Sequence, residues 1–100
     1  MEIVWSHAAR TRLEEIRAYV AQDRPEAAAR LATRIVALVE ALKVHPYLGR
    51  ASTEPGIREL VVGGTPFVVL YRVRGQRVTV NTIWHTAQHK TKSVGGDPPS

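Results

Sequence analysis

The stretch "GIRELVVGGTPFVVLYRVRGQRVTVNTIWH", residues 56–85, decides the fold of this 100-residue chain. Residues that favour strands, mainly valine, isoleucine, threonine and aromatics, form three runs at 56–62, 67–73 and 77–85. The segments "GGTP" and "RGQ" between them contain the glycine and proline typical of short turns. The pattern therefore predicts three consecutive strands in an antiparallel meander.

The middle run is the most apolar of the three. "FVVLY", residues 67–71, has apolar side chains at consecutive positions, and successive side chains of a strand point to opposite faces of the sheet. Strands with this composition are covered on both faces. We expect this one to be central, covered on one side and partly covered on the other.

Upstream of the meander, apolar residues at spacings of three and four indicate two amphipathic helices. "MEIVWS", residues 1–6, predicts a short strand, and Ser6 is placed to cap a first helix that ends near Gln22. Pro25 suits the first position of a second helix, which runs to about Lys43. The short link between them predicts an antiparallel helix hairpin.

The order of these elements predicts an α+β fold, in which the helix hairpin packs on one face of the C-terminal meander (β-α-α-β-β-β). The net charge is +5, and residues 43–92 hold eight basic side chains and only two acidic ones. We therefore expect the other face of the sheet to be an accessible, concave and basic surface. Such a surface attracts nucleic acid or an acidic protein segment, although the charge could also serve solubility alone.

"HPYLGR", residues 45–50, joins the second helix to the meander. Pro46 ends the helix because proline cannot continue it. Gly49 is expected to have a positive φ at a tight reversal. Tyr47 and Leu48 are expected to cover the end of the core, because both side chains are apolar and large.

A chain of this length forms one domain, which we place at residues 1–90, with a flexible tail at residues 91–100. The chain has no cysteine, which excludes disulfides and thiol chemistry. No run approaches the roughly 20 apolar residues that span a membrane. We expect a cytoplasmic protein that needs no cofactor and binds no membrane.

Five motifs stand in order along the chain: "W-S-x-x-A" from Trp5, "P-x-L-G-R" from Pro46, "G-I-R-E-L" from Gly56, "F-V-V-L-Y-R-V" from Phe67 and "I-W-H-T-A-Q" from Ile83. In this order and spacing they resemble the RelE/ParE superfamily of bacterial toxin–antitoxin toxins, over residues 2–90. The resemblance implies the same fold, a location in the bacterial cytoplasm, and a type II toxin–antitoxin system whose cognate antitoxin neutralises the toxin.

The resemblance implies one of two activities. RelE-like members are metal-free ribonucleases that cut mRNA on the ribosome, whereas ParE-like members inhibit DNA gyrase. A nuclease needs a base, an acid and cations around one phosphate. RelE-like nucleases usually have an arginine a few residues before the tyrosine of the penultimate strand, where this chain has Val68, and a lysine-rich preceding strand, where it has "IREL". These departures favour a ParE-like gyrase inhibitor that acts by binding, and leave it uncertain whether the protein is an enzyme.

Two alternatives stay open. The chain could be a ribosome-dependent mRNA endoribonuclease that uses Arg58, Arg72 and His85, if these side chains converge from three strands. It could also be a degenerate member that binds its antitoxin without poisoning a target. Tyr71 is expected to be a core aromatic, because adjacent residues of a strand point to opposite faces and Tyr71 therefore points away from Arg72.

Target or antitoxin binding is assigned to basic residues of the sheet half: Arg50, Arg58, Arg72, Arg74, Arg77 and His85. Three of them have structural alternatives. Arg50 could brace the Pro–Gly turn, Arg58 could pair with a helix carboxylate, and His85 could be hydrogen-bonded at a strand end. His85 and His89 have the spacing of a zinc pair, but no Glu or Cys accompanies them, so no metal is predicted.

The resemblance also implies the partners. An acidic or apolar C-terminal segment of the cognate antitoxin is expected to lie against the helix hairpin and the open face or edge of the sheet. The target would be DNA gyrase, or the ribosome and mRNA in the nuclease alternative. Operator DNA is expected to be contacted only through the antitoxin.

Overall fold

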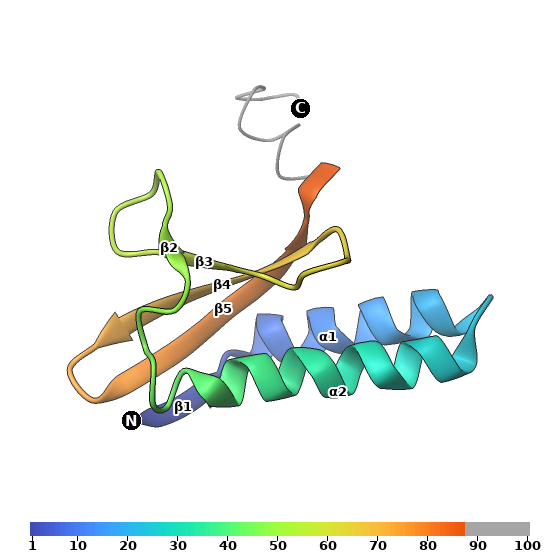
Figure 1. Ribbon diagram of the computed structural model, residues 1–100, viewed down its shortest axis with the longest axis horizontal. Coiled ribbons are helices and arrows are strands. Elements are labelled where there is room, and N and C mark those ends of the chain that lie inside the picture. The colour runs from blue at the N-terminus through green and yellow to red at the C-terminus, as the bar shows by residue number, and fades with distance from the viewer. Residues whose placement is uncertain (88–100) are drawn as a thin grey trace.

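The computed structural model describes residues 1–87, which form two layers, a five-stranded sheet and a pair of helices (Figure 1). The elements follow in the order β1 (Glu2–Trp5), α1 (His7–Ala21), α2 (Pro25–Ala41), β2 (Arg50–Ala51), β3 (Arg58–Val61), β4 (Phe67–Arg74) and β5 (Arg77–His85). The predicted α+β order is confirmed, with β2 as an addition. The predicted tail, residues 91–100, lies outside the described residues. Within residues 1–87, neither helix is long and apolar enough to cross a membrane.

The sheet has the strand order β1-β5-β4-β3-β2. Strands β3, β4 and β5 form the predicted antiparallel meander, with β4 at its centre. β1 adds to this meander parallel to β5, with Ile3 opposite Val78, so the first and last strands lie side by side (Figure 1). β2 pairs antiparallel with the start of β3. The sequence does not predict β2, because two residues are too few to show a periodic pattern.

The helices begin where the capping residues predict and end one to two residues early. The Ser6 hydroxyl accepts a hydrogen bond from the Ala9 backbone N–H at 3.0 Å and donates one to the Asn81 carbonyl at 2.9 Å. Ser6 therefore caps α1 and also ties its start to β5. Pro25 occupies the first turn of α2, and Glu26 follows it there, where a negative charge complements the helix dipole.

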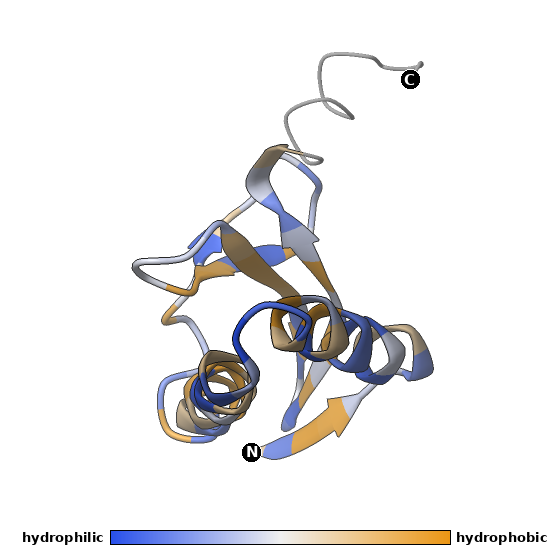
Figure 2. Ribbon diagram, turned by 90° about the vertical axis from the view of Figure 1, so that its right-hand side faces the viewer, coloured by the Kyte–Doolittle hydropathy of each residue, from blue (hydrophilic) through white to orange (hydrophobic). Residues whose placement is uncertain are grey.

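Both helices pack on one face of the sheet. Their buried residues, such as Ile16 of α1 and Ile35 of α2, meet alternate residues of β4, namely Phe67, Val69 and Tyr71. Figure 2 looks nearly along the two helices, and hydrophilic and hydrophobic segments alternate along each of them. This amphipathic pattern is the physical basis of the layer order, since each apolar stripe is buried against the sheet and the neighbouring helix.

The other face of the sheet is covered in part, as the apolar run of the central strand predicts. Ile57, Val68 and Leu70 are buried there in a second, smaller cluster, with Trp84 packed against it. We call these four residues the apolar cluster. Ile57 ends the loop from β2 to β3, so the loop folds back onto this face. The double-sided burial expected for the central strand is thus confirmed.

The junction at residues 45–50 differs from its prediction. Tyr47 and Leu48 do not cover the core, because they are 65% and 52% exposed. Tyr71 fills that space instead, as its side chain is fully buried beneath the junction. The prediction for Tyr71 is confirmed, whereas the prediction for Tyr47 and Leu48 is wrong.

Gly49 is required for space rather than for a positive φ. A Cβ atom at this position would lie 2.7 Å from the Glu59 carbonyl oxygen and 2.8 Å from Cε1 of Tyr71. Positive φ values occur elsewhere, including Gly64 (78°) and Gly75 (57°) in the two turns of the meander. The close approach of two chain segments, which the sequence pattern does not show, explains the glycine.

Candidate functional site

The structure does not bring Arg58, Arg72 and His85 together. Arg58 pairs with Tyr71 across β3 and β4, and His85 pairs with Phe67 across β4 and β5. Directly paired residues point to the same face, so Arg58 and His85 lie on the helix side of the sheet. Arg72 follows Tyr71 along β4 and points to the opposite face. The three side chains therefore do not converge on one phosphate, and the convergence that the nuclease alternative needs is not found.

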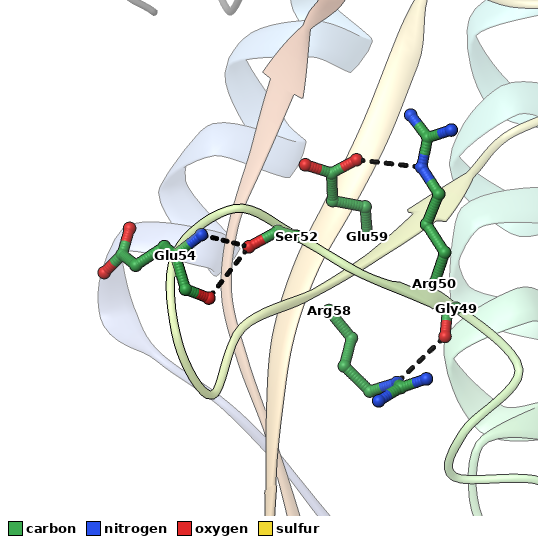
Figure 3. Close-up of polar contacts among 6 residues, drawn as sticks. All are labelled: Gly49, Arg50, Ser52, Glu54, Arg58 and Glu59. Atoms are coloured by element: carbon green, nitrogen blue, oxygen red, sulfur yellow. Dashed lines mark hydrogen bonds and ion pairs between the residues drawn. The ribbon is translucent and has the colours of Figure 1, made fainter.

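Arg58 is held by the junction rather than by a helix carboxylate. Its Nε donates to the Gly49 carbonyl at 2.8 Å (Figure 3). Its guanidinium lies 5.1 Å from the centre of the Tyr47 ring. The hydrogen bond and the cation–π contact fix both ends of the group. Arg58 thus keeps the exposed Tyr47 in place on the surface.

Tyr71 anchors the same junction from inside the core. Its hydroxyl accepts a hydrogen bond from the Gly49 backbone N–H and donates one to the Pro46 carbonyl, each at 2.8 Å. Burial raises the pKa of the Tyr71 hydroxyl, because the phenolate would lose hydration in the core, while the Gly49 hydrogen bond and the Arg58 charge oppose the shift. The neutral hydroxyl is therefore a structural bridge, not a proton donor facing a substrate.

Arg50 points to the opposite side of the sheet from Arg58 (Figure 3). Its Nε lies 3.1 Å from Oε1 of Glu59, the residue directly opposite it on β3. The Glu59 side chain is 10% exposed, whereas that of Arg50 is 75% exposed. Arg50 therefore neutralises a mostly buried carboxylate while most of its own surface stays available for contact.

His85 ends β5 and lines a groove beside α1. Its Nδ1 accepts a hydrogen bond from the Ala87 N–H at 3.2 Å, and its ring meets the Phe67 ring edge-on at 5.5 Å. The groove has a volume of about 580 Å³. We call it the α1 groove, and its lining consists of Arg12, Glu15, Ile16, Tyr19, Phe67, His85 and Ala87.

The sequence did not single out the contribution of α1 to this groove. Tyr19 is 71% exposed, yet it stands on the same helix face as the buried Ile16. Arg12 donates from Nε to the Ile83 carbonyl at 3.0 Å, which ties the helix to β5. The spacing of positions 12, 16 and 19 places these residues on one face of a helix. Such spacing alone predicts a buried face and does not predict a groove.

A metal site has no support among residues 1–87, where no three metal-ligating side chains come together. His89, the second residue of the predicted histidine pair, lies outside the described residues. His85 is accounted for within this range by a hydrogen bond and a ring contact.

The open face of the sheet has two halves of opposite character. At one end lies the apolar cluster, which includes Val68, with Glu59 on the same face beside it. At the other end, near the turn between β4 and β5, a hollow of about 530 Å³ is lined by basic and polar side chains. We call it the arginine hollow, and its lining consists of Arg72, Arg74, Gln76, Arg77, Thr79, Asn81 and Glu2.

Three residues from the predicted binding set, Arg72, Arg74 and Arg77, meet in the arginine hollow. Arg50 and His85 lie elsewhere, on β2 and at the end of β5. The predicted basic surface is thus smaller than the whole open face. The described residues hold two separate candidate binding sites, the arginine hollow and the α1 groove.

Comparison with known proteins agrees with the fold and with the family resemblance. The family described as the ParE toxin of the type II toxin–antitoxin system, parDE, matches residues 3–89. "Putative toxin Y4kP" of Sinorhizobium fredii (strain NBRC 101917 / NGR234) is 40% identical over 86 residues, which cover 86% of this chain and 88% of that protein. "Toxin RelE2" of Caulobacter vibrioides (strain ATCC 19089 / CIP 103742 / CB 15) is 37% identical over 87 residues, or 87% and 97% of the two chains.

A solved structure described as the chromosomal ParDE TA system from P. aeruginosa superposes with a TM-score of 0.77 at 28% identity. The superposition covers 85% of this chain and 95% of the other. The family match, the sequence identities and the superposition each cover most of the chain, and they confirm the resemblance to the RelE/ParE superfamily. The chain belongs to the ParE toxin family of type II toxin–antitoxin systems.

Proposed function

We propose that this chain is a toxin that acts by binding DNA gyrase and inhibiting it, and that a cognate antitoxin neutralises it. The observation that carries this proposal is the apolar cluster on the open face. Val68, which occupies the position where RelE-like nucleases usually have an arginine, is buried in this cluster with Ile57 and Leu70. A buried valine offers no charge to a reacting phosphate.

The electrostatics of that position oppose phosphate chemistry. The phosphorane of RNA cleavage carries extra negative charge, and the loss of one preorganised donor at such a centre typically costs about 3–4 kcal/mol of transition-state stabilisation. The Glu59 carboxylate lies on the same face, where Arg50 pairs with it and offsets its charge. Binding to a protein target requires no charge at this position.

The test measures DNA supercoiling by gyrase and mRNA cleavage on the ribosome in parallel. Purified toxin should block DNA supercoiling by gyrase and leave mRNA uncut in a translation extract, and addition of the antitoxin should restore supercoiling. Clean cleavage of ribosome-bound mRNA, with supercoiling unaffected, would contradict the proposal.

A ribosome-dependent endoribonuclease is the second candidate, because the similar Caulobacter protein is named RelE2 and His85 is only partly buried beside Arg12 and Glu15. In that case His85→Ala should abolish toxicity while antitoxin binding is kept. His45→Ala, at an exposed histidine in the junction, is the matched control. A fully toxic His85→Ala variant would count against this candidate. A folded chain that arrests no growth when overexpressed would indicate instead a degenerate member that only binds its antitoxin.

We infer that the antitoxin segment lies in the α1 groove. The groove combines the exposed Tyr19 and the apolar Ile16 and Phe67 with charged side chains at its rim. An aromatic side chain of this kind is a typical anchor at protein interfaces. Tyr19→Ser should weaken antitoxin binding at least tenfold, about 1.4 kcal/mol. Tyr47→Ser, at an exposed tyrosine outside the groove, should have little effect, and equal losses in both variants would reject this position.

Operator DNA would then be recognised through the antitoxin, as the family resemblance implies. Gyrase, the ribosome and their substrates are found in the bacterial cytoplasm, which is the compartment we propose for this toxin.

A further inference from the structure

The arginine hollow concentrates positive charge on one face of three adjacent strands. The register places Arg72 opposite Thr79 and Arg74 opposite Arg77, and Glu2 lies beside Arg77 on β1. Like charges directly opposite each other destabilise a sheet. One carboxylate is present, that of Glu2, whose Oε1 lies 3.1 Å from Nε of Arg77. The ion pairs among residues 1–87 include neither Arg72 nor Arg74, so the hollow has an excess of positive charge.

Arg72 is positioned by the loop that covers the apolar cluster. A Cβ atom added at Gly56 would lie 2.6 Å from Nη1 of Arg72, so the guanidinium packs directly against the bare glycine backbone. Arg72 is also half-buried, in contrast to the exposed Arg74. The guanidinium at the inner end of the hollow is therefore placed before any ligand arrives, which reduces the entropy lost on binding.

The neutral residues of the hollow identify the class of anion. Arginine together with Gln, Thr and Asn side chains is the set that contacts phosphate oxygens in nucleic-acid backbones. Gln76, Thr79 and Asn81 supply these neutral groups, and arginine binds phosphate with two parallel hydrogen bonds. A protein segment would need apolar anchors, but the lining of the hollow has none, because the apolar cluster and the exposed Val61 lie at the other end of this face. The composition therefore favours a phosphodiester chain over an acidic peptide.

We propose that the arginine hollow binds the phosphate backbone of duplex DNA without reading its sequence. The choice of duplex DNA rests on the proposed function, because gyrase works on duplex DNA and a toxin bound to it would meet that DNA. The contact lies at the opposite end of the open face from Val68, so it is distinct from the position of nuclease chemistry. Backbone contacts carry no sequence information, and recognition of an operator would still depend on the antitoxin.

The experiment measures binding of the purified full-length toxin to a fluorescein-labelled duplex of about 20 base pairs, by anisotropy over a series of NaCl concentrations. The test variant is Arg72→Gln/Arg74→Gln. The matched control is Arg30→Gln/Arg34→Gln, which removes the same charge from exposed positions of α2. The test variant should lose about tenfold or more in affinity, and its log–log salt slope should fall by about 2. The control should keep both values near those of the unchanged protein.

A further variant, Arg72→Lys/Arg74→Lys, keeps the charge and removes the paired donors, and it should give an intermediate affinity. Circular dichroism checks that each variant is folded. If the glutamine variant is not folded, the lysine variant takes its place as the test variant. Equal losses of affinity in the test and control variants would mean that binding depends only on the net charge of the protein. No loss of affinity in either variant would reject the site. Displacement of the DNA by a poly-glutamate peptide at lower concentration than by unlabelled duplex would assign the hollow to an acidic protein segment instead. No gyrase is present in this assay, so its result is independent of whether the proposed target is correct.

Discussion

At the scale of single residues, Tyr71 connects the core to the junction that follows α2. The ring is fully buried, and its hydroxyl bridges the backbones of Pro46 and Gly49. Gly49 completes the contact, because any side chain there would collide with the Tyr71 ring. This arrangement explains the glycine, and because Tyr71 already fills the space beneath the junction, Tyr47 and Leu48 are left exposed.

The first prediction concerns the hydroxyl of Tyr71. Tyr71→Phe keeps the ring and leaves the buried Gly49 N–H without its acceptor, so the free energy of unfolding should fall by about 1–3 kcal/mol. Urea unfolding followed by circular dichroism measures the change. Tyr19→Phe removes the hydroxyl of a 71% exposed tyrosine and should change stability by less than about 0.5 kcal/mol. Equal effects of the two substitutions would contradict the bridging role.

The second prediction is the behaviour of the same residue at alkaline pH. Burial raises the pKa of Tyr71 in the folded state above the unfolded value of about 10, so folding favours the protonated form. Its contribution to stability is complete below the unfolded pKa and is lost as pH rises through the folded pKa. The unchanged protein should therefore lose stability faster above about pH 10 than Tyr71→Phe does. Urea midpoints of both proteins over this range test the difference, and parallel curves would argue against it.

At the scale of elements, the position of α1 depends on contacts with β5 at its start and along its length. Ser6 bonds to Asn81, and Arg12 bonds to Ile83. Both acceptors are backbone carbonyls of the last strand, which also pairs with β1 on its outer side. The helix is therefore fixed to the sheet by hydrogen bonds as well as by apolar packing, and the α1 groove has a rigid wall.

The third prediction tests this attachment. Ser6→Ala removes the acceptor of the Ala9 N–H and the donor to Asn81, so the free energy of unfolding should fall by about 1–2 kcal/mol. Thr11→Ala, at an exposed position of the same helix, is the control and should cause no comparable loss. Thermal or urea unfolding provides the measurement. If the two variants are equally stable, the cap does not support the helix.

At the scale of the whole molecule, the two candidate binding sites lie on opposite sides of one sheet. The α1 groove is on the helix side, and the arginine hollow is on the open side. A partner in one site therefore does not cover the other directly. The net charge of +5 acts on both sites, since long-range attraction depends on the summed charge of the molecule.

The fourth prediction concerns this summed charge. If charge steers an acidic antitoxin segment to the toxin, the dissociation constant of the complex should rise with NaCl concentration, because salt screens charges beyond about 8–10 Å near physiological ionic strength. Isothermal titration calorimetry across salt concentrations measures this. Tyr19→Ser should weaken binding at every concentration without altering the slope. A dissociation constant that does not change with salt would leave apolar burial as the driving force.

Part of the candidate site was predictable from the sequence. The rest was not, for reasons that differ from residue to residue. The sequence identified Arg72, Arg74 and Arg77 as basic residues of the sheet half, and the strand pattern placed Tyr71 and Arg72 on opposite faces. It did not identify Tyr19 as part of a groove, because an apolar position on a helix predicts burial. It also grouped Arg58 and His85 with Arg72, since alternation within one strand does not fix the face of a neighbouring strand.

The sequence by itself determined the two helices, the three-stranded meander and the family, because helical and strand periodicities are local properties of the chain. The tertiary structure alone decided that β1 pairs with β5, that the loop before β3 covers the apolar cluster, and that Gly49 is needed for space. It also decided which cations share a site. Each of these depends on contacts between residues far apart in the chain, and the register of strand pairing, which sets the face of every side chain, is fixed only when the sheet forms and its core is packed.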